Sequence, residues 1–207
     1  AFGGLFNKLI KRGDKLTAIN SFSHEDSSHR QATQWMMTGH KNPKRDQTAN
    51  PEYPSYGSIV SAVFGSNHPV HGMPSYVKQG NIVGEQPAFL GGDCKPFDPS
   101  NKDNLIPKVQ LDRFKDRKNL LSQLDRATIV SPTANSFRML GDQAYNTILG
   151  NAKDAFDLEK EPEAMRNKYG KNNIGNQLLL ARRLAQFGTK FITISYGGWD
   201  MHQNIKK

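Results

Sequence analysis

The sequence is poor in cysteine and contains no long apolar stretch. Cys94 is the only cysteine among 207 residues, which excludes an intramolecular disulfide framework and a zinc site built from clustered thiolates. The longest apolar runs, 178–181 and 191–195, fall far short of the ~20 residues that a membrane-spanning helix needs. We therefore expect no transmembrane segment in this chain.

Acidic residues are outnumbered by basic ones. Lys and Arg total 28 against 19 Asp and Glu, so the formal net charge is +9, which is compatible with anionic partners. The basic residues are scattered in ones and twos, and acidic residues are interleaved with them over 112–125, as is typical of a solvated mixed surface. No zinc-finger, ribonucleoprotein or basic-zipper motif is found. We expect no nucleic-acid partner.

A folded core is nevertheless expected. Hydrophobic residues make up 36% of the chain and aromatic residues 9%. Disordered chains, which are too polar to form a core, normally contain fewer of both. The chain begins with Ala rather than Met, has no signal-peptide pattern, and stops soon after its most site-like residues. We therefore expect residues 1–207 to form a single domain that is incomplete at both ends and belongs to a longer protein.

Both ends of the sequence show the same order of expected elements. Apolar spacing predicts a helix over 5–10, followed by a strand over 15–20 and a polar loop over 21–29. Near the other end, a helix over 174–187 precedes a strand over 190–196 that is apolar enough to be buried on both faces. Such alternation predicts an α/β fold with a mainly parallel sheet.

Helices and one long loop are expected between these two units. Residues 66–107 are rich in Gly and Pro, contain short strand candidates at 76–78 and 81–83, and read as a loop region at the rim of a site. The remaining predicted helices cover 30–37, 55–64, 111–126, 136–149 and a short stretch from about 156 to 169.

Asp200 and His202 follow the predicted strand 190–196, and in open α/β sheets ligands gather beyond the carboxyl ends of strands. In an extended segment, residues two apart lie on one side, roughly 6 to 7 Å apart at the backbone, so both could bind one divalent ion. A carboxylate beside an imidazole suits zinc, manganese, iron or magnesium. The alternative is a loop histidine capped by a neighbouring aspartate.

His24 and His29 lie in the loop after the first predicted strand, with Asp26 between them. Two imidazoles and a carboxylate can bind a metal, or one histidine can act as nucleophile or acid/base while the aspartate orients it. The alternative is a polar helix start with Ser27 or Ser28 as N-cap. Both interpretations can hold together.

The order of several segments resembles a bacterial family called domain of unknown function 1501 (DUF1501). The resemblance covers essentially the whole chain and rests on residues 21–24, 29–39, 53–57, 155–158, 161–162, 166–170, 178–183 and 198–202. It implies a sulfatase-like domain related to the alkaline phosphatase superfamily. The fold would be a three-layer sandwich with a mainly parallel sheet flanked by helices, partly contained in these residues.

The resemblance also implies roles for the four candidate site residues. In the superfamily the catalytic nucleophile lies ten residues before the Gly that ends its helix, and counting back from Gly39 gives His29. His29 replaces the usual Cys, Ser or Thr, so it is a nucleophile, a metal ligand, or a sign that covalent chemistry is lost. His24 would assist as acid/base or ligand, and Asp200 and His202 look like the superfamily's metal-binding pair. Its other metal ligands are expected outside these residues.

The implied function is metal-dependent hydrolysis of sulfate or phosphate esters. The cofactor would be zinc, manganese, magnesium or calcium, and the substrate an anionic ester such as a sulfated polysaccharide. The resemblance further implies export to the periplasm or the extracellular space by a twin-arginine signal that this sequence does not contain. An alternative from another class is a non-catalytic protein on the same fold that binds anionic glycans through its +9 surface.

Overall fold

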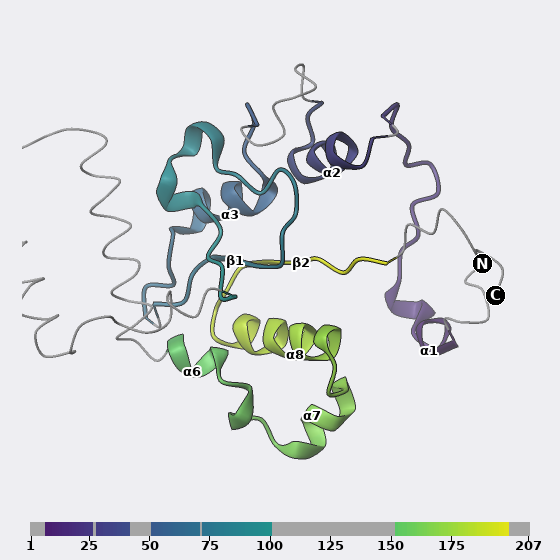
Figure 1. The fold of residues 1–207 in the computed structure, drawn as a ribbon, viewed down its shortest axis with the longest axis vertical. Coiled ribbons are helices and arrows are strands. Elements are labelled where there is room, and N and C mark those ends of the chain that lie inside the picture. Colours follow the sequence, from purple (N-terminus) through teal and green to yellow (C-terminus); the bar gives the residue numbers. More distant parts are fainter. Residues whose placement is uncertain (1–6, 27, 42–50, 71, 101–151, 199–207) are drawn as a thin grey trace, which may run out of the picture.

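The computed structural model of this chain describes residues 7–26, 28–41, 51–70, 72–100 and 152–198. Its sheet consists of strands β1 (Tyr76–Gln79) and β2 (Phe191–Ile194), which lie between helices (Figure 1). The strands are parallel, with Tyr76 opposite Phe191 and Gln79 opposite Ile194. The expected mixture of helices with a parallel sheet is thus confirmed. The three-layer sandwich is not, because the sheet of the described residues has two strands.

The described helices and 3₁₀ turns are α1 (Asn7–Ile10), η2 (Gly13–Lys15), α2 (His29–Thr38), α3 (Tyr56–Phe64), η3 (Ala88–Leu90), η4 (Gly92–Cys94), α6 (Ala152–Phe156), η6 (Leu158–Lys160), α7 (Glu163–Tyr169) and α8 (Asn173–Gln186). The predicted helices over 30–37, 55–64 and 174–187 are confirmed as α2, α3 and α8. The helices predicted over 111–126 and 136–149 lie outside the described residues.

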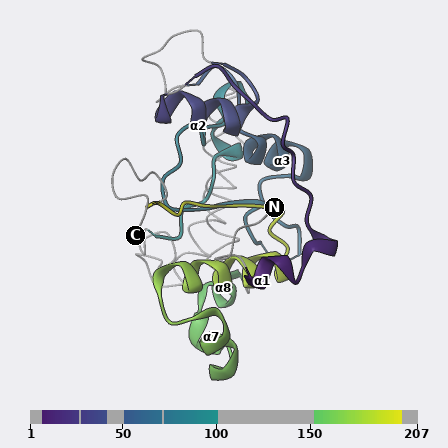
Figure 2. The same ribbon diagram turned by 90° about the vertical axis from the view of Figure 1, so that its right-hand side faces the viewer.

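Helices α3 and α8 cover opposite faces of the strand pair (Figures 1 and 2). Successive strand residues point to opposite faces, so Tyr76 packs under Gly57 of α3, and the side chain of Gln79 donates a hydrogen bond to the carbonyl of Gln177 in α8 at 3.0 Å. The core on the α8 side is built from the fully buried Met73, Val77, Ala155 and Leu184, against which Phe97, Phe156, Leu180, Phe187 and Ile192 pack.

Next to this core, a buried ion-pair cluster fastens α6 and Glu161, the residue after η6, to α8. Glu161 accepts hydrogen bonds from Arg183 Nη1 at 2.6 Å and from Arg182 Nη2 at 2.5 Å. Arg183 also donates through Nε to the carbonyl of Ala155 at 2.9 Å, and through Nη2 to the carbonyl of Asp154 at 2.6 Å. Breaking a buried pair leaves an uncompensated charge, so this cluster is a structural clamp.

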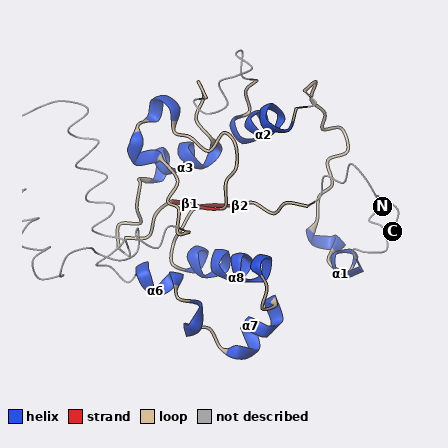
Figure 3. Cartoon of the chain, in the orientation of Figure 1, coloured by secondary structure: helices blue, strands red, loops and turns tan. Residues whose placement is uncertain are grey.

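The strand predicted over 15–20 is wrong. Residues 16–20 form no strand in the structure, and Figure 3 shows loop after the helical turns of α1 and η2. The segment has the composition of a strand, but Leu16 is 39% exposed and Ile19 71% exposed. It therefore has no neighbouring strand among the described residues. A lone strand has no partner for its backbone groups and gains nothing over loop. The candidate at 81–83 is loop as well, whereas the one at 76–78 is confirmed as β1.

Within the described ranges, every helix is too short or too polar to cross a membrane, which agrees with the expectation from the sequence.

Candidate functional site

The carboxyl ends of both strands open into loops that leave the sheet side by side. The amide of Ser195 donates to the carbonyl of Gln79 at 2.9 Å, and a Cβ atom on Gly80 would lie 2.8 Å from Cβ of Ser195. Ligands of parallel sheets bind beyond this edge. Asp200 and His202 follow β2 in the sequence, and both lie outside the described residues.

Helix α2 packs against the loop after β1. Gly84, with φ of +92°, approaches Gln34 so closely that a Cβ atom there would lie 3.0 Å from Cα of Gln34. Figure 1 shows this loop rising from the end of β1 alongside α2. The helix that begins at His29 therefore contacts, through Gln34, the loop that leaves the carboxyl end of β1. That the 24–29 and 200–202 loops share this edge stays a prediction, since residues 200–202 are not described.

The start of α2 contains both features that the sequence predicted there, a candidate N-cap serine and a histidine. Ser28 occupies the N-cap position, but its side chain makes no capping bond. Instead, the amide of Ser28 donates to Oδ1 of Asp26 at 2.8 Å. His29 is the first helical residue and is exposed, and its carbonyl accepts from the hydroxyl of Thr33 at 2.6 Å. The imidazole thus stands at the positive end of the helix dipole, which favours anions.

Aromatic and basic side chains gather around α2, and we call His24, Trp35, His40, Lys41 and Tyr53 the α2 aromatic cluster. The rings of His24 and Trp35 are tilted at 47° with centroids 6.1 Å apart, and His40 stacks on Tyr53 at 3.9 Å. Lys41 Nζ lies 5.4 Å from the Trp35 ring centroid. In this cluster His24, His40, Lys41 and Tyr53 are exposed.

No metal site is formed by the described residues alone. Three or more His, Cys, Asp or Glu side chains do not come together anywhere in them. His24 lies in the loop before α2, and His29 is the first residue of this helix. No acidic side chain of the described residues comes together with both histidines to form a set of metal ligands.

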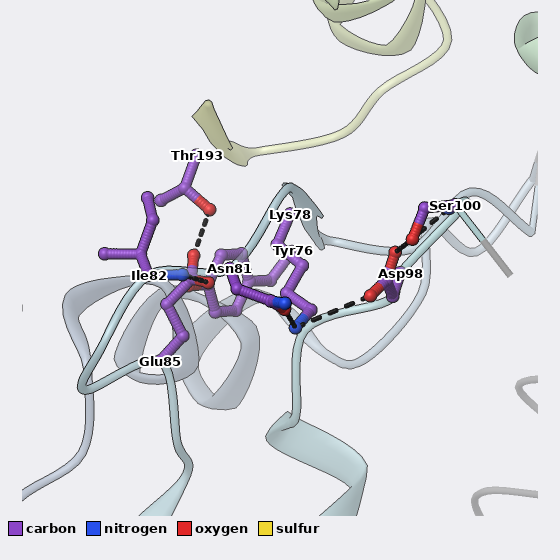
Figure 4. A network of polar contacts seen from close by, with 8 residues as sticks. All are labelled: Tyr76, Lys78, Asn81, Ile82, Glu85, Asp98, Ser100 and Thr193. Atoms are coloured by element: carbon purple, nitrogen blue, oxygen red, sulfur yellow. Dashed lines mark hydrogen bonds and ion pairs between the residues drawn. The ribbon is translucent and has the colours of Figure 1, made fainter. Parts of the chain in front are cut away.

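The sequence analysis missed a buried carboxylate at the same edge. Glu85 accepts hydrogen bonds from Tyr76 Oη at 3.0 Å, from the amide of Ile82 at 3.2 Å and from the hydroxyl of Thr193 (Figure 4). Burial and then the negative charge of Glu85 raise the pKa of Tyr76 far above its usual range, so its phenol stays protonated and donates. Nothing local in the Gly-rich and Pro-rich loop marks Glu85, because its partners come from two strands.

Lys78 and Asp98 form a more exposed polar group beside this network (Figure 4). Lys78 Nζ lies 3.5 Å from a carboxylate oxygen of Asp98 and donates to the side-chain oxygen of Asn81 at 3.2 Å. Asp98 in turn accepts from the amide of Ser100 at 3.0 Å. These contacts tie both the loop after β1 and the segment around residue 98 to Lys78 of the strand.

Cys94 is buried in η4. Burial and then the neighbouring charge of Asp93 raise the pKa of the Cys94 thiol to about 11. A thiol that stays protonated at neutral pH is a poor nucleophile, so Cys94 has a packing role.

Comparison with known proteins gives one match. A family model described as "Protein of unknown function (DUF1501)" matches residues 1–207. No curated protein and no solved structure matches the chain.

Proposed function

Because the chain belongs to the DUF1501 family, we propose that it acts as a metal-dependent hydrolase of sulfate or phosphate esters on a sulfatase-like fold. One observation supports this most. Helix α2, which begins at His29, packs through Gln34 against the loop at the carboxyl edge of the parallel strands, and β2 runs on toward Asp200 and His202. This is the edge at which α/β proteins bind their ligands.

The proposed chemistry divides between the metal and the chain. A divalent ion, whether zinc, manganese, magnesium or calcium, would polarise the ester oxygens and offset charge on the leaving oxygen. Asp200 and His202 are the proposed ligands, since a carboxylate and an imidazole suit such ions. His29, exposed at the start of α2, is the group proposed at the attack position.

The start of α2 supports an anionic substrate. The positive end of the helix dipole attracts sulfate and phosphate groups, and an exposed imidazole there is accessible to them. His24 is proposed as acid/base or further ligand, next to Trp35. As part of the same proposal, the protein is exported and acts on an anionic ester such as a sulfated polysaccharide.

Metal content tests this proposal. Purified full-length protein should hold divalent metal in stoichiometric amount by elemental analysis, and Asp200→Ala should lower it. His40→Ala serves as the control, because it removes an exposed imidazole that has no role in the proposal. Equal metal content in wild type and Asp200→Ala would leave a capped loop histidine as the better account of residues 200–202.

The α2 aromatic cluster favours a second candidate, a non-catalytic protein that binds anionic glycans. Flat aromatic rings provide apolar contact area, and Lys41 adds a positive charge, although Glu25 lies 3.4 Å from its Nζ and offsets part of it. This candidate predicts salt-sensitive binding of a sulfated polysaccharide without metal, weakened by Lys41→Ala or Tyr53→Ala. Hydrolysis that requires metal and survives Lys41→Ala would contradict it.

A further inference from the structure

Glu85 is held by three segments of the chain at once. Its carboxylate accepts from Tyr76 in β1 at 3.0 Å, from Thr193 in β2, and from the amide of Ile82 in the loop at 3.2 Å (Figure 4). Its side chain is nearly enclosed, with the residue only 4% exposed. The side chain of Glu85 thus forms hydrogen bonds with both strands and with the loop that follows β1.

These bonds differ in kind from those of Glu161. Glu161 is paired with two guanidinium groups, whereas the partners of Glu85 in the described part of the chain are two hydroxyls and one amide. A buried carboxylate without a cation is costly, and a neutral or apolar side chain of similar size would serve stability as well or better. The carboxylate instead fixes the orientation of its partners, because its lone pairs accept several hydrogen bonds at defined angles.

The residues beside Glu85 and Thr193 lead to both halves of the proposed site. Thr193 lies two residues before Ser195, where β2 passes into the segment that runs toward Asp200. Gly84, next to Glu85, touches the backbone of Gln34 in α2. On its other side, the carbonyl of Gln86 accepts from the amide of Ser55, the N-cap of α3, at 3.0 Å.

We infer that Glu85 is a positioning residue of the proposed site. Through Thr193 it sets the direction in which the chain leaves β2, and through Gly84 it sets the place of the helix that begins at His29. This inference rests on the proposed function, because it assigns Glu85 to the edge of the sheet at which the proposed site lies.

Metal affinity and local hydrogen exchange of the full-length protein test the inference together. In Glu85→Ala, three donors lose their acceptor, so amides of 80–86 and 191–198 should exchange faster. The dissociation constant for zinc should rise about tenfold, at the lower end of the effect of groups that orient metal ligands. Glu85→Gln should recover part of the affinity, because its amide oxygen can accept from Ile82 while its amide nitrogen donates to the hydroxyls.

Two further variants keep the test decisive. Glu161→Gln is the matched control for Glu85→Gln, since it makes the same change at another buried glutamate, one that is bonded to Arg182 and Arg183 of α8 and to neither strand, and its zinc affinity should equal that of wild type. If Glu85→Ala does not fold, Thr193→Val removes one hydroxyl with little change in shape. It should weaken zinc binding while Glu161→Gln does not.

The possible failures are distinguishable. Unchanged zinc affinity in Glu85→Ala and Thr193→Val, with wild type binding zinc, would overturn the positioning role and leave the proposed function intact. A fall in affinity of equal size in Glu161→Gln would overturn it too, because the effect would then follow from stability alone. Wild-type protein that binds no zinc, manganese, magnesium or calcium would overturn the proposed function itself, and the positioning role with it.

Discussion

Gly84 and Gln34 meet backbone to backbone, since a Cβ atom on Gly84 would come within 3.0 Å of Cα of Gln34. Gly84 also has a φ of +92°, a conformation that residues with a side chain rarely adopt. The contact brings α2 against the loop that follows β1, although the two residues lie 50 positions apart in the sequence. Only glycine allows this approach.

The first prediction concerns this contact. Gly84→Ala should lower the free energy of unfolding by about 1–3 kcal/mol, because the new methyl group combines backbone strain with a close approach to α2. Gly13→Ala is the control, since a Cβ atom there meets nothing within 4 Å and its φ is not in the strained region. Chemical denaturation measures both. Equal stability of the two variants would contradict the close packing of α2.

A second prediction concerns the core between the sheet and α8. Leu184→Ala should lower the free energy of unfolding by about 2–5 kcal/mol, because Leu184 is fully buried against Met73 and Val77 and its loss leaves a cavity. Leu178 lies on the same helix and is 45% exposed, so Leu178→Ala should cost less than about 1 kcal/mol. A reversed order of the two variants would mean that α8 presents its other face to the sheet.

Local signals were enough to predict α2, α3 and α8. The helix α2 ends at Gly39 in the left-handed conformation, and α3 begins after Ser55, whose hydroxyl accepts from the amide of Ser58 at 3.3 Å. Both caps are visible in the sequence because they depend on residues a few positions apart. The strand β2 was likewise predictable from its β-branched composition.

Contacts between distant residues were not predictable in this way. Residues 16–20 have the composition of a strand but lie exposed, because strand formation depends on a partner and not on composition alone. Glu85 was missed for the same reason, since Thr193 is 108 positions away from it in the sequence. In the candidate site, the sequence indicated His24 and His29, whereas the packing of α2 on Gly84 required the structure.

A third prediction concerns stability in acid. The hydrogen bond from Arg183, opposed by burial and assisted by Arg182, holds the pKa of Glu161 below its usual range. A carboxyl with a lowered folded-state pKa stabilises the protein above its unfolded pKa of about 4.3, and this contribution is lost as pH falls through the folded-state value. Glu161→Gln should therefore be less stable at pH 7 and lose less stability on acidification.

Urea denaturation between pH 7 and pH 3 measures this difference. Glu163→Gln is the control, because its side chain is 68% exposed and its contact with Lys171 is a surface ion pair. If the stability of Glu161→Gln falls with decreasing pH as steeply as that of wild type, the cluster with Arg182 and Arg183 does not exist as described.

A fourth prediction concerns alkaline conditions. The pKa of Tyr76 is raised by burial and by the charge of Glu85, so the folded state binds the phenolic proton more tightly than the unfolded state. The resulting stability is fully present below the unfolded pKa of about 10 and is lost as pH rises above it. Tyr76→Phe should be less stable at pH 8, because Glu85 loses a donor, and its stability should decline less above pH 10 than that of wild type.

The control for this prediction is Tyr196→Phe, since Tyr196 is exposed on the segment after β2. Unfolding free energies of the three proteins between pH 8 and pH 11 give the comparison. A decline in Tyr76→Phe as steep as in wild type would show that the buried phenol is not the group responsible.

Turnover of an ester tests the central claim most directly. Full-length protein is assayed for hydrolysis of an aryl sulfate and an aryl phosphate, with zinc, manganese, magnesium or calcium added in turn. The account predicts metal-dependent turnover of at least one ester that is abolished by His29→Ala and by Asp200→Ala and retained by His40→Ala. No turnover of either ester with any of the four metals, or turnover that both His29→Ala and Asp200→Ala retain, would contradict it.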